Sequence, residues 1–303
     1  MEPVLRTDMA SAGLDRIVAS AEGPELVASG LTFGEGPLWV AAEGSFYWVD
    51  IIGDTIWKWT PGQGQEVFLR PSGKANGLTL DRQGRMIIAG WGSRCVWRRE
   101  GDGTMRSLAS HYRGVRINTP NDIVVRSDGS IYWTDPTGAL FIPGMAGDDV
   151  QRYLDSHPVF CLSPDERTLR SVVDDVAYPN GLCFSPDESL LYVNDTWRGH
   201  IRAFEVHPDG SLGGGDVFYS LVGDEPGVAD GMKVDSEGNI YVTGPGGIHI
   251  VDPGGRLLGR IRLNEHATNM AWGHSDWRTM YVTTFHSVYR LRLGIPGVPV
   301  GPL

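Results

Sequence analysis

Short runs of apolar residues, each interrupted by a cluster of turn-forming residues, recur along most of the chain. Residues 121–135 give a clear example, because an apolar run is followed by an Asp-Gly turn and a second apolar run that ends at Asp135. Such runs are typical of short β-strands joined as hairpins. No comparable run with the 3.6-residue period of a helix occurs. The pattern therefore predicts an all-β protein.

The same hairpin recurs with a polar residue at the entrance to its first strand. The aligned entrance residues are Glu35, Asn76, Asn121, Asn180, Asp230 and Asn269. By subtraction of these residue numbers, successive repeats are 41, 45, 59, 50 and 39 residues apart. A period of about 40–50 residues with several short strands per repeat is typical of a β-propeller blade. The six repeats predict six blades.

The two ends of the repeat region predict how the propeller closes. The last repeat contains three strand-like runs, and residues 25–28 form a lone strand candidate before the first repeat. We expect this N-terminal strand to complete the last blade and to cover a sheet edge that would otherwise be open. The expected organisation is an N-terminal extension (residues 1–24), a six-bladed β-propeller (residues 25–292) and a C-terminal tail (residues 293–303).

The entrance residues are candidates for a metal site. In a propeller the first strands of all blades line the central channel and run in the same direction, so their entrance residues should form a ring at one mouth. Two carboxylates and up to four amides would meet there, with no Lys or Arg among them. Such oxygen ligands favour one divalent cation, with Ca²⁺ preferred and Mg²⁺, Mn²⁺, Zn²⁺ or Fe²⁺ as alternatives. Two competing interpretations are that Asn-Gly marks hairpin turns, or that these side chains only hydrogen-bond the strand ends.

Loops between the second and third strands should rise around the same mouth. Among the residues that they carry are Trp91, Trp197 and His286. The longest of these loops spans about residues 136–158 and contains several apolar residues. It is either a lid over the mouth or a surface feature ordered by its own side chains.

Composition narrows the choice of partners and of compartment. The 303 residues include 26 Lys plus Arg and 37 Asp plus Glu, and the resulting net charge of −11 argues against a nucleic-acid partner. Nothing approaches 18 consecutive apolar residues, so we expect no membrane partner. The three cysteines are far apart and lack C-x-x-C spacing, which predicts reduced thiols and a cytoplasmic protein.

Four motifs stand at the strand entrances: G-E-G-P at residues 34–37, P-N-D at 120–122, P-N-G-L at 179–182 and A-D-G-M at 229–232. Together they resemble the SMP-30/gluconolactonase/luciferin-regenerating-enzyme-like family, over roughly residues 30–292. The resemblance implies a six-bladed propeller, a divalent cation and hydrolysis of a lactone, with a sugar lactone as the leading substrate. It also implies metal binding by Glu35, Asn121, Asn180 and Asp230, substrate contact by Asn121, and a general-base role for Asp230.

The chain departs from this resemblance at Thr119, where many members with sugar-lactone activity have Arg. A guanidinium at this position would bind substrate oxygens through two hydrogen bonds. Its loss points away from gluconolactone itself, toward another sugar lactone or a less polar lactone, with Arg94 or Arg116 as candidate replacements. The predicted substrate-contacting residues are Asn76, Trp91, Thr119, Asn121, Trp197 and His286.

The leading hypothesis is a lactonase in which the cation polarises the carbonyl and Asp230 assists the attacking water. No G-x-S-x-G motif is present, and this reaction needs no serine nucleophile. Two alternatives are a phosphotriester hydrolase on the same metal centre and a propeller that only binds protein partners. Strand alternation predicts that Asp122 points away from the axis and supports the ring from behind.

Overall fold

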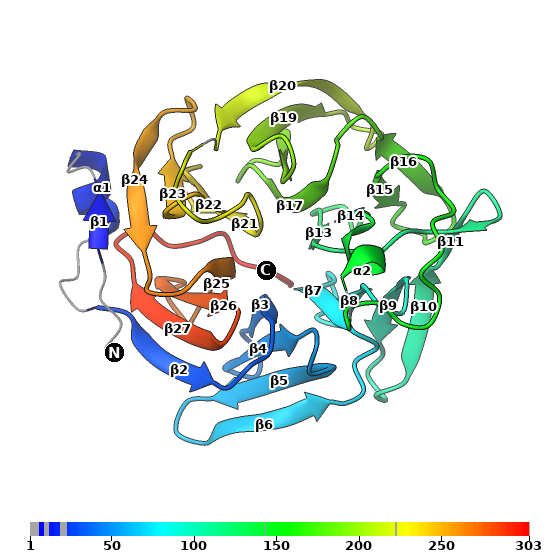
Figure 1. Cartoon of the computed structure of the whole chain (residues 1–303), viewed down its shortest axis with the longest axis horizontal. Helices are drawn as coiled ribbons and strands as arrows, with labels where there is room; N and C mark the ends of the chain where they lie inside the picture. Colours follow the sequence, from blue (N-terminus) through cyan, green and yellow to red (C-terminus); the bar gives the residue numbers. More distant parts are fainter. Residues whose placement is uncertain (1–5, 9–11, 19–22, 143, 222, 303) are drawn as a thin grey trace.

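Each predicted hairpin repeat folds into one β-sheet, and the sheets are arranged around a common axis (Figure 1). The computed structural model describes residues 6–8, 12–18, 23–142, 144–221 and 223–302. Within these residues, six sheets of four or five strands surround the axis. The predicted all-β, six-bladed β-propeller is therefore confirmed.

The first four blades are antiparallel sheets whose strands follow one another from the axis outward. Blade 1 consists of β3 (Gly34–Val40), β4 (Ser45–Asp50), β5 (Thr55–Thr60) and β6 (Gly64–Leu69). Blade 2 consists of β7 (Ala75–Leu80), β8 (Met86–Gly90), β9 (Cys95–Arg99) and β10 (Met105–Ala109). Blade 3 consists of β13 (Ile123–Val125), β14 (Ile131–Thr134), β15 (Val159–Leu162) and β16 (Leu169–Val173). Blade 4 consists of β17 (Pro179–Phe184), β18 (Leu190–Asp195), β19 (His200–Val206) and β20 (Leu212–Ser220).

The last two blades include strands from the N-terminal part of the chain. Blade 5 consists of β21 (Met232–Val234), β22 (Ile240–Gly244), β23 (Gly247–Val251) and β24 (Leu257–Arg262), with β1 (Arg6–Asp8) paired to β24. Blade 6 consists of β25 (Ala267–Gly273), β26 (Thr279–Thr284) and β27 (Ser287–Arg292). The strand β2 (Glu25–Ser29) pairs antiparallel with β27, so the predicted completion of the last blade by an N-terminal strand is confirmed. The pairing of β1 with blade 5 was not predicted.

Three short elements complete the described structure. The helix α1 (Ala12–Ile17) lies beside β24. A two-stranded hairpin, β11 (His111–Tyr112) and β12 (Val115–Arg116), connects blades 2 and 3. The helix α2 (Gly138–Phe141) lies in the long loop of blade 3. No helix in the described part of the chain is long and apolar enough to cross a membrane.

The innermost strands form a closed cycle, because β3, β7, β13, β17, β21 and β25 contact one another in this order and β25 contacts β3. Stacked aromatic rings strengthen the contact where blade 6 meets blade 1. The rings of Phe46 and Tyr281 lie 4.1 Å apart with an angle of 11° between their planes. Trp39 stacks on His274 in the same seam, at 4.9 Å. Aromatic pairs add stabilisation beyond the apolar area that they bury.

After β27 the chain crosses the end of the channel formed by the hairpin turns. Val298 N–H donates to Val234 O at 3.3 Å, and Arg82 donates to Gly301 O at 3.0 Å. The segment of residues 298–301 accordingly lies near the axis in Figure 1. A cavity of about 440 Å³ lies between this segment and the innermost strands. The opposite end of the channel is the end at which the innermost strands begin, and it is called the ring face below.

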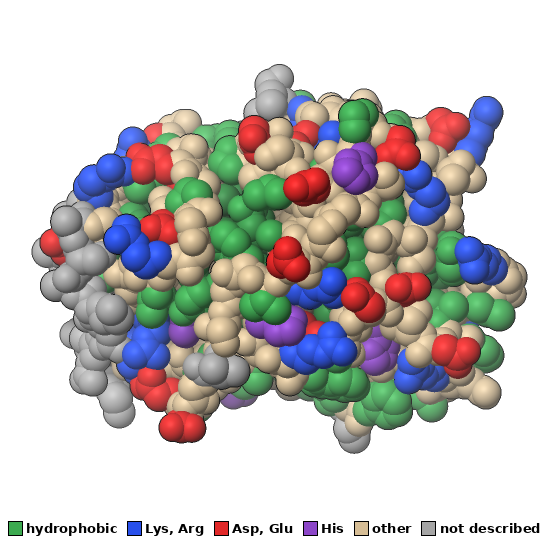
Figure 2. Space-filling view, turned by 90° about the horizontal axis from the view of Figure 1, so that it is seen from above, with side chains coloured by type: hydrophobic (Ala, Val, Ile, Leu, Met, Phe, Trp, Pro, Cys, Tyr) green, Lys and Arg blue, Asp and Glu red, His purple; other side chains and the backbone are tan. Residues whose placement is uncertain are grey.

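The outer surface shown in Figure 2 carries interspersed acidic and basic side chains. Many charged side chains of the protein are paired, as in Arg290 on β27 with Glu25 on β2 at 2.7 Å, and Arg202 on β19 with Asp175 in the loop before β17 at 2.7 Å. Inside the protein, Cys95, Cys161 and Cys183 are all buried and free of disulfides.

Acidic residues at the ends of second strands tie the ring face together in three blades. Asp50, Asp135 and Asp195 each accept backbone N–H groups from residues two or three positions before the entrance residue of their own blade. Asp195 also accepts the N–H groups of Trp197 and Arg198, both at 3.1 Å. A carboxylate that accepts several backbone N–H groups holds two loops in one position.

We expect Asp195→Ala to lower the free energy of unfolding by about 3–5 kcal/mol, because it leaves one buried and three partly buried N–H donors without this acceptor. Urea unfolding followed by tryptophan fluorescence measures the change. Asp209→Ala is the matched control, because among the described residues this exposed carboxylate bonds only to Ser211, and its loss should cost under about 1 kcal/mol. Equal losses for the two variants would contradict the role given to Asp195.

Candidate active site

The structure brings the six entrance residues, called the ring residues below, to one end of the channel. Asp230 is partly exposed. The other five are buried, with at most 6% of each residue exposed: Glu35, Asn76, Asn121, Asn180 and Asn269. Asn269 Nδ2 donates to Glu35 Oε2 at 3.1 Å, which links the last blade to the first. Two carboxyls and four amides therefore surround the axis.

A glycine follows four of the ring residues and allows the next blade to approach closely. A Cβ atom on these glycines would lie only 2.0–2.5 Å from an atom of the next ring residue; they are Gly36, Gly77, Gly181 and Gly231. The backbone also joins the blades directly, because Gly77 N–H donates to Asn121 O at 2.8 Å and Gly181 N–H donates to Asp230 O at 3.1 Å. The Asn-Gly and Asp-Gly pairs thus serve close packing between blades and are not hairpin turns.

Asp122 lies next to the ring and does not point away from it as predicted. Asn121 N–H donates to Thr134 O at 2.8 Å, and Thr134 N–H donates to Asp122 O at 3.1 Å, so two residues oppose one. Such a β-bulge interrupts the strict alternation of side chains on which the prediction depended. The carboxylate of Asp122 accepts a hydrogen bond from Lys233 Nζ at 3.1 Å, and Lys233 also donates to Asn269 Oδ1 at 3.3 Å.

Lys233 is a cation beside the ring that the sequence analysis did not identify. Its third contact is a hydrogen bond to Met232 O at 3.0 Å. Its positive charge lowers the pKa of Asp230 and partly opposes the effect of burial. It stands three positions after Asp230, where the other repeats have Leu38, Thr79, Val124, Cys183 and Trp272. The sequence could have indicated Lys233, because it is the one charged residue among the six at this position of the repeat.

Both ring carboxyls have raised pKa values. Burial is the main cause for Glu35, and the negative charge of Asp230 adds to it. Burial also raises the pKa of Asp230, to about 7, although the hydrogen bond with Asn180 lowers it. The nearby charge of Asp122 raises both pKa values further. Gathered carboxyls of this kind are stabilised in their ionised form by a bound cation.

The donor set of the ring fits a hard divalent cation. Oδ1 of Asn76 and Oδ1 of Asn180 are buried and have no hydrogen-bond donor among the described residues. The amide of Asn180 is oriented by Nδ2, which donates to Thr196 Oγ1 at 3.2 Å. Within the described part of the chain, no three His, Cys, Asp or Glu side chains form a metal-ligand cluster, so a cation here would depend on amide oxygens.

Two of the predicted substrate-contacting residues lie near α2, whereas His286 lies elsewhere. Trp91 is buried, and a Cβ on Gly138 in α2 would be 3.2 Å from its Cζ2 atom. Trp197 is 63% exposed, and its ring lies 5.1 Å from that of Tyr178. His286 is exposed at the junction of blades 6 and 1, with Nδ1 3.1 Å from Leu31 O.

Thr119 is buried, and its hydroxyl donates to Pro136 O. Neither arginine considered as a replacement for the missing guanidinium is free to act as one. Arg94 donates to the backbone carbonyls of Ile117, Asn118 and Gln151, so it holds two loops together. Arg116 donates to Asp149 at 2.7 Å and to Ser93 O at 3.1 Å.

The helix in the long loop of blade 3 presents its last residue to solvent and buries the other three. Gly138, Ala139 and Leu140 of α2 are buried, whereas Phe141 is 68% exposed. Figure 1 places α2 close to the inner strands of blades 2 and 3. The loop thus forms part of the wall on the ring face.

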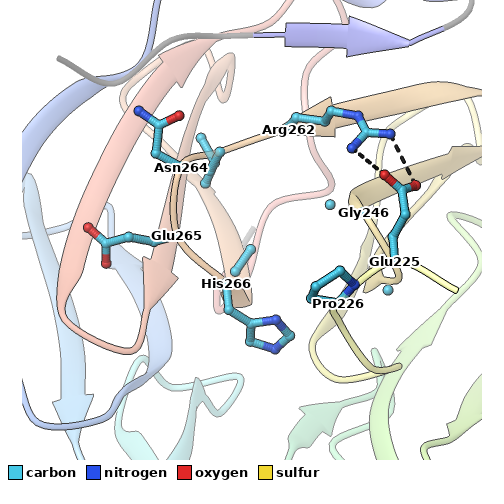
Figure 3. A pocket seen from close by; sticks show the side chains of 11 residues that line it. Glu225, Pro226, Gly246, Arg262, Asn264, Glu265 and His266 are labelled. Atoms are coloured by element: carbon cyan, nitrogen blue, oxygen red, sulfur yellow. Dashed lines mark hydrogen bonds and ion pairs between the residues drawn. The ribbon is translucent and has the colours of Figure 1, made fainter. Parts of the chain in front are cut away.

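A cleft of about 320 Å³ lies on the ring face between blades 5 and 6, and the sequence analysis did not predict it. Figure 3 shows the ion pair of Arg262 with Glu225, at 2.7 Å, along one side of this cleft. His266 extends toward Pro226 within it and stacks on Phe285 at 4.9 Å. The three segments that form the cleft are connections between strands or blades, which converge on this face.

By its fold and site, the protein is a six-bladed β-propeller with carboxylates and amides gathered around one mouth of its channel. Residues 33–286 match the SMP-30/gluconolactonase/LRE-like region. The chain belongs to this family.

Individual relatives agree with this assignment. A gluconolactonase of Zymomonas mobilis is 31% identical over 92% of this chain and 83% of its own length. A pentonolactonase of Haloferax volcanii is 28% identical over 86% of this chain and 84% of its own length. The solved structure of a gluconolactonase from Xanthomonas campestris superposes with a TM-score of 0.88 at 31% identity, covering 97% of this chain and 98% of that chain.

Asp135 gives a test of the electrostatics on the ring face. It is fully buried, its Oδ1 has no donor among the described residues, and burial raises its pKa to about 8. The folded state therefore keeps a proton that the unfolded chain loses near its ordinary pKa of 3.8. The stabilisation linked to this proton is complete below that value and is lost as the pH rises toward about 8.

We expect Asp135→Asn to remove this loss, so the variant should gain stability relative to the wild type between about pH 5 and pH 8. In the wild type, the Asp135 carboxyl accepts a hydrogen bond from the N–H of Asn118 at 2.7 Å. The neutral amide of the variant keeps an oxygen that can accept the same hydrogen bond. Urea unfolding at both pH values measures the difference. Parallel pH dependences for the two proteins would contradict the prediction.

Proposed function

We propose that this protein is a hydrolase that depends on a divalent cation and opens the ring of a lactone, with sugar lactones as its substrate class. The observation that carries the proposal is the ring of two carboxyls with raised pKa values and amide oxygens without donors. Family relatives named gluconolactonase and pentonolactonase support the choice of a lactone.

Glu35, Asn121, Asn180 and Asp230 are the proposed ligands. Their donors are all oxygen atoms, which favours Ca²⁺ and accommodates Mg²⁺ or Mn²⁺. When bound, the cation supplies positive charge that polarises the lactone carbonyl. Asn269 is less suited to a ligand role, because its amide already bonds to Glu35 and Lys233.

Asp230 has the properties of a general base for the attacking water. It is the partly exposed member of the ring, and its backbone N–H is held by Thr243 Oγ1 at 3.1 Å. A carboxylate with a pKa near 7 accepts a proton more readily than an ordinary aspartate does. One carboxylate oxygen of Asp230 would take a proton from the water as the water oxygen bonds to the carbonyl carbon. The ring C–O bond then breaks, and the leaving ring oxygen takes up that proton.

No observation favours a phosphotriester hydrolase or a protein-binding scaffold over the lactonase. Bringing carboxyls together in a buried ring is costly unless a cation compensates for their charge. A propeller that only binds protein partners would gain nothing from this free-energy cost. The buried, free cysteines also support the proposal of a cytoplasmic enzyme.

We expect Asp230→Ala to lower kcat for lactone opening by about 10²–10⁴-fold, because it removes the proton acceptor. An indicator assay of acid release from a panel of aldonolactones measures the rate, and thermal melting checks the fold. Asp224→Ala is the matched control, since this exposed carboxylate lies on the same loop. A variant of Asp230 with near-normal turnover would refute the general-base role.

Calcium binding should release protons near neutral pH and should tighten as the pH rises from about 6 to 8. The reason is that the raised pKa values of Glu35 and Asp230 leave these carboxyls partly protonated until a cation draws off their protons. Titration calorimetry in two buffers with different ionisation enthalpies counts the protons. Glu35→Gln should reduce both proton release and affinity, and binding without proton release would contradict the account.

A further inference from the structure

The residues that stand two positions before each ring residue form a second set of side chains. Two positions before each ring residue, the chain has Phe33, Lys74, Thr119, Tyr178, Val228 and Ala267. Two of their polar groups are already bound by the protein, because the Thr119 hydroxyl donates to Pro136 O and Lys74 Nζ donates to Ile52 O at 2.8 Å. The hydroxyl of Tyr178 is the exception.

Tyr178 is only 8% exposed, and its hydroxyl has no hydrogen-bond partner among the described residues. The hydroxyl oxygen is not enclosed by protein atoms, so it is free to donate a hydrogen bond to a ligand. In the neighbouring ring residue, Asn180 Nδ2 donates to Thr196 Oγ1 at 3.2 Å.

The position of the hydroxyl is defined from two sides. A Cβ on Gly138 would lie 1.7 Å from the hydroxyl oxygen, so the oxygen rests against the first residue of α2. Trp91 is close to the same point, 3.2 Å from that Cβ. The hydroxyl therefore lies against α2 and close to Trp91, in the wall of the ring face.

The ring of Tyr178 is held in one orientation. It lies 5.1 Å from the Trp197 ring at an angle of 41°, and 6.3 Å from the His157 ring at 62°. Both nitrogens of His157 are in hydrogen bonds, with Ala177 O and with Thr137 Oγ1. Asp195 accepts the backbone N–H of Tyr178 at 3.2 Å. A donor held in this way loses little conformational freedom when a ligand binds.

We propose that Tyr178 is a substrate-contacting residue whose hydroxyl donates a hydrogen bond to a hydroxyl oxygen of the bound sugar lactone. Trp197, which is 63% exposed beside it, covers the C–H face of the same ligand. The inference rests on the proposed lactonase function and extends it to the recognition of hydroxylated lactones. In this arrangement Tyr178 provides one neutral donor in the layer where Thr119 stands in place of a guanidinium.

The test compares Tyr178→Phe with the wild type on two substrates. One is the aldonolactone that the wild type opens fastest, and the other is δ-valerolactone, which has no hydroxyl groups, used as substrate or as competitive inhibitor. Loss of one neutral hydrogen bond should lower kcat/KM for the aldonolactone about three- to tenfold, mainly through KM. The constants for δ-valerolactone should change less than about twofold, because it offers no hydroxyl oxygen to this donor.

The matched control is Tyr132→Phe. Tyr132 is also a buried tyrosine, but its hydroxyl donates to Gly210 O, in a hairpin turn on the face opposite the ring. This variant should lose thermal stability without a selective effect on the aldonolactone. Unchanged kinetics of Tyr178→Phe, or equal losses on both substrates, would overturn the inference while leaving the lactonase function standing. A wild type that opens no lactone would overturn both.

A second variant disturbs the same hydroxyl through a substitution in α2. Gly138→Ala places a methyl group where the Tyr178 hydroxyl now lies, so one of the two must move. We expect it to lower kcat/KM for the aldonolactone, and to have a smaller effect when Tyr178 is already Phe. Full additivity of the two substitutions would show that they act independently and would count against the inference.

Discussion

The close approach of neighbouring blades at the ring face is the constraint on which the rest of the structure depends. At four of the six positions a glycine follows the ring residue, and a Cβ there would lie 2.0–2.5 Å from the next ring residue. Only with this approach do backbone hydrogen bonds such as Gly77 N–H to Asn121 O connect the blades. The same close approach brings the carboxyl and amide side chains together around the axis, so the contacts that pack the blades also assemble the candidate site.

Gathering these side chains opposes folding unless their charges are balanced. Burial raises the pKa values of Glu35 and Asp230, and the neighbouring Asp122 raises them further. Lys233 offsets part of this charge by bonding to Asp122 and Asn269. The three hydrogen bonds of this ammonium group go to Asp122, Met232 O and Asn269, so it stabilises the protein from beside the ring without bonding to the proposed ligands. A divalent cation would balance the remaining charge, which ties stability to the proposed activity.

The loops of the ring face are held by buried polar contacts, as the positioning of a substrate requires. Asp195 fixes the entry to β17 through backbone N–H groups, and Arg94 fixes the segments at residues 117–118 and 149–151 through their carbonyls. Most polar groups in these loops therefore already form hydrogen bonds within the protein. The side chain of Tyr178 is largely buried and its ring packs against Trp197, whereas its hydroxyl has no partner in the described part of the chain.

The sequence by itself determined the number of blades, the closure of the last blade by a strand at residues 25–28 and the identity of the ring residues. All three depend on a local repeat, because strand period and turn chemistry are set within each 40–50-residue unit. Tertiary structure decided what depends on contacts between units. Strand alternation placed Asp122 wrongly because a β-bulge opposite Thr134 resets it. The role of Lys233 came from blade 3 meeting blade 5, 111 residues away in sequence. Whether Thr119, Arg94 or Tyr178 has a polar group to spare depended on hydrogen-bond partners in other loops, which a repeat pattern does not encode.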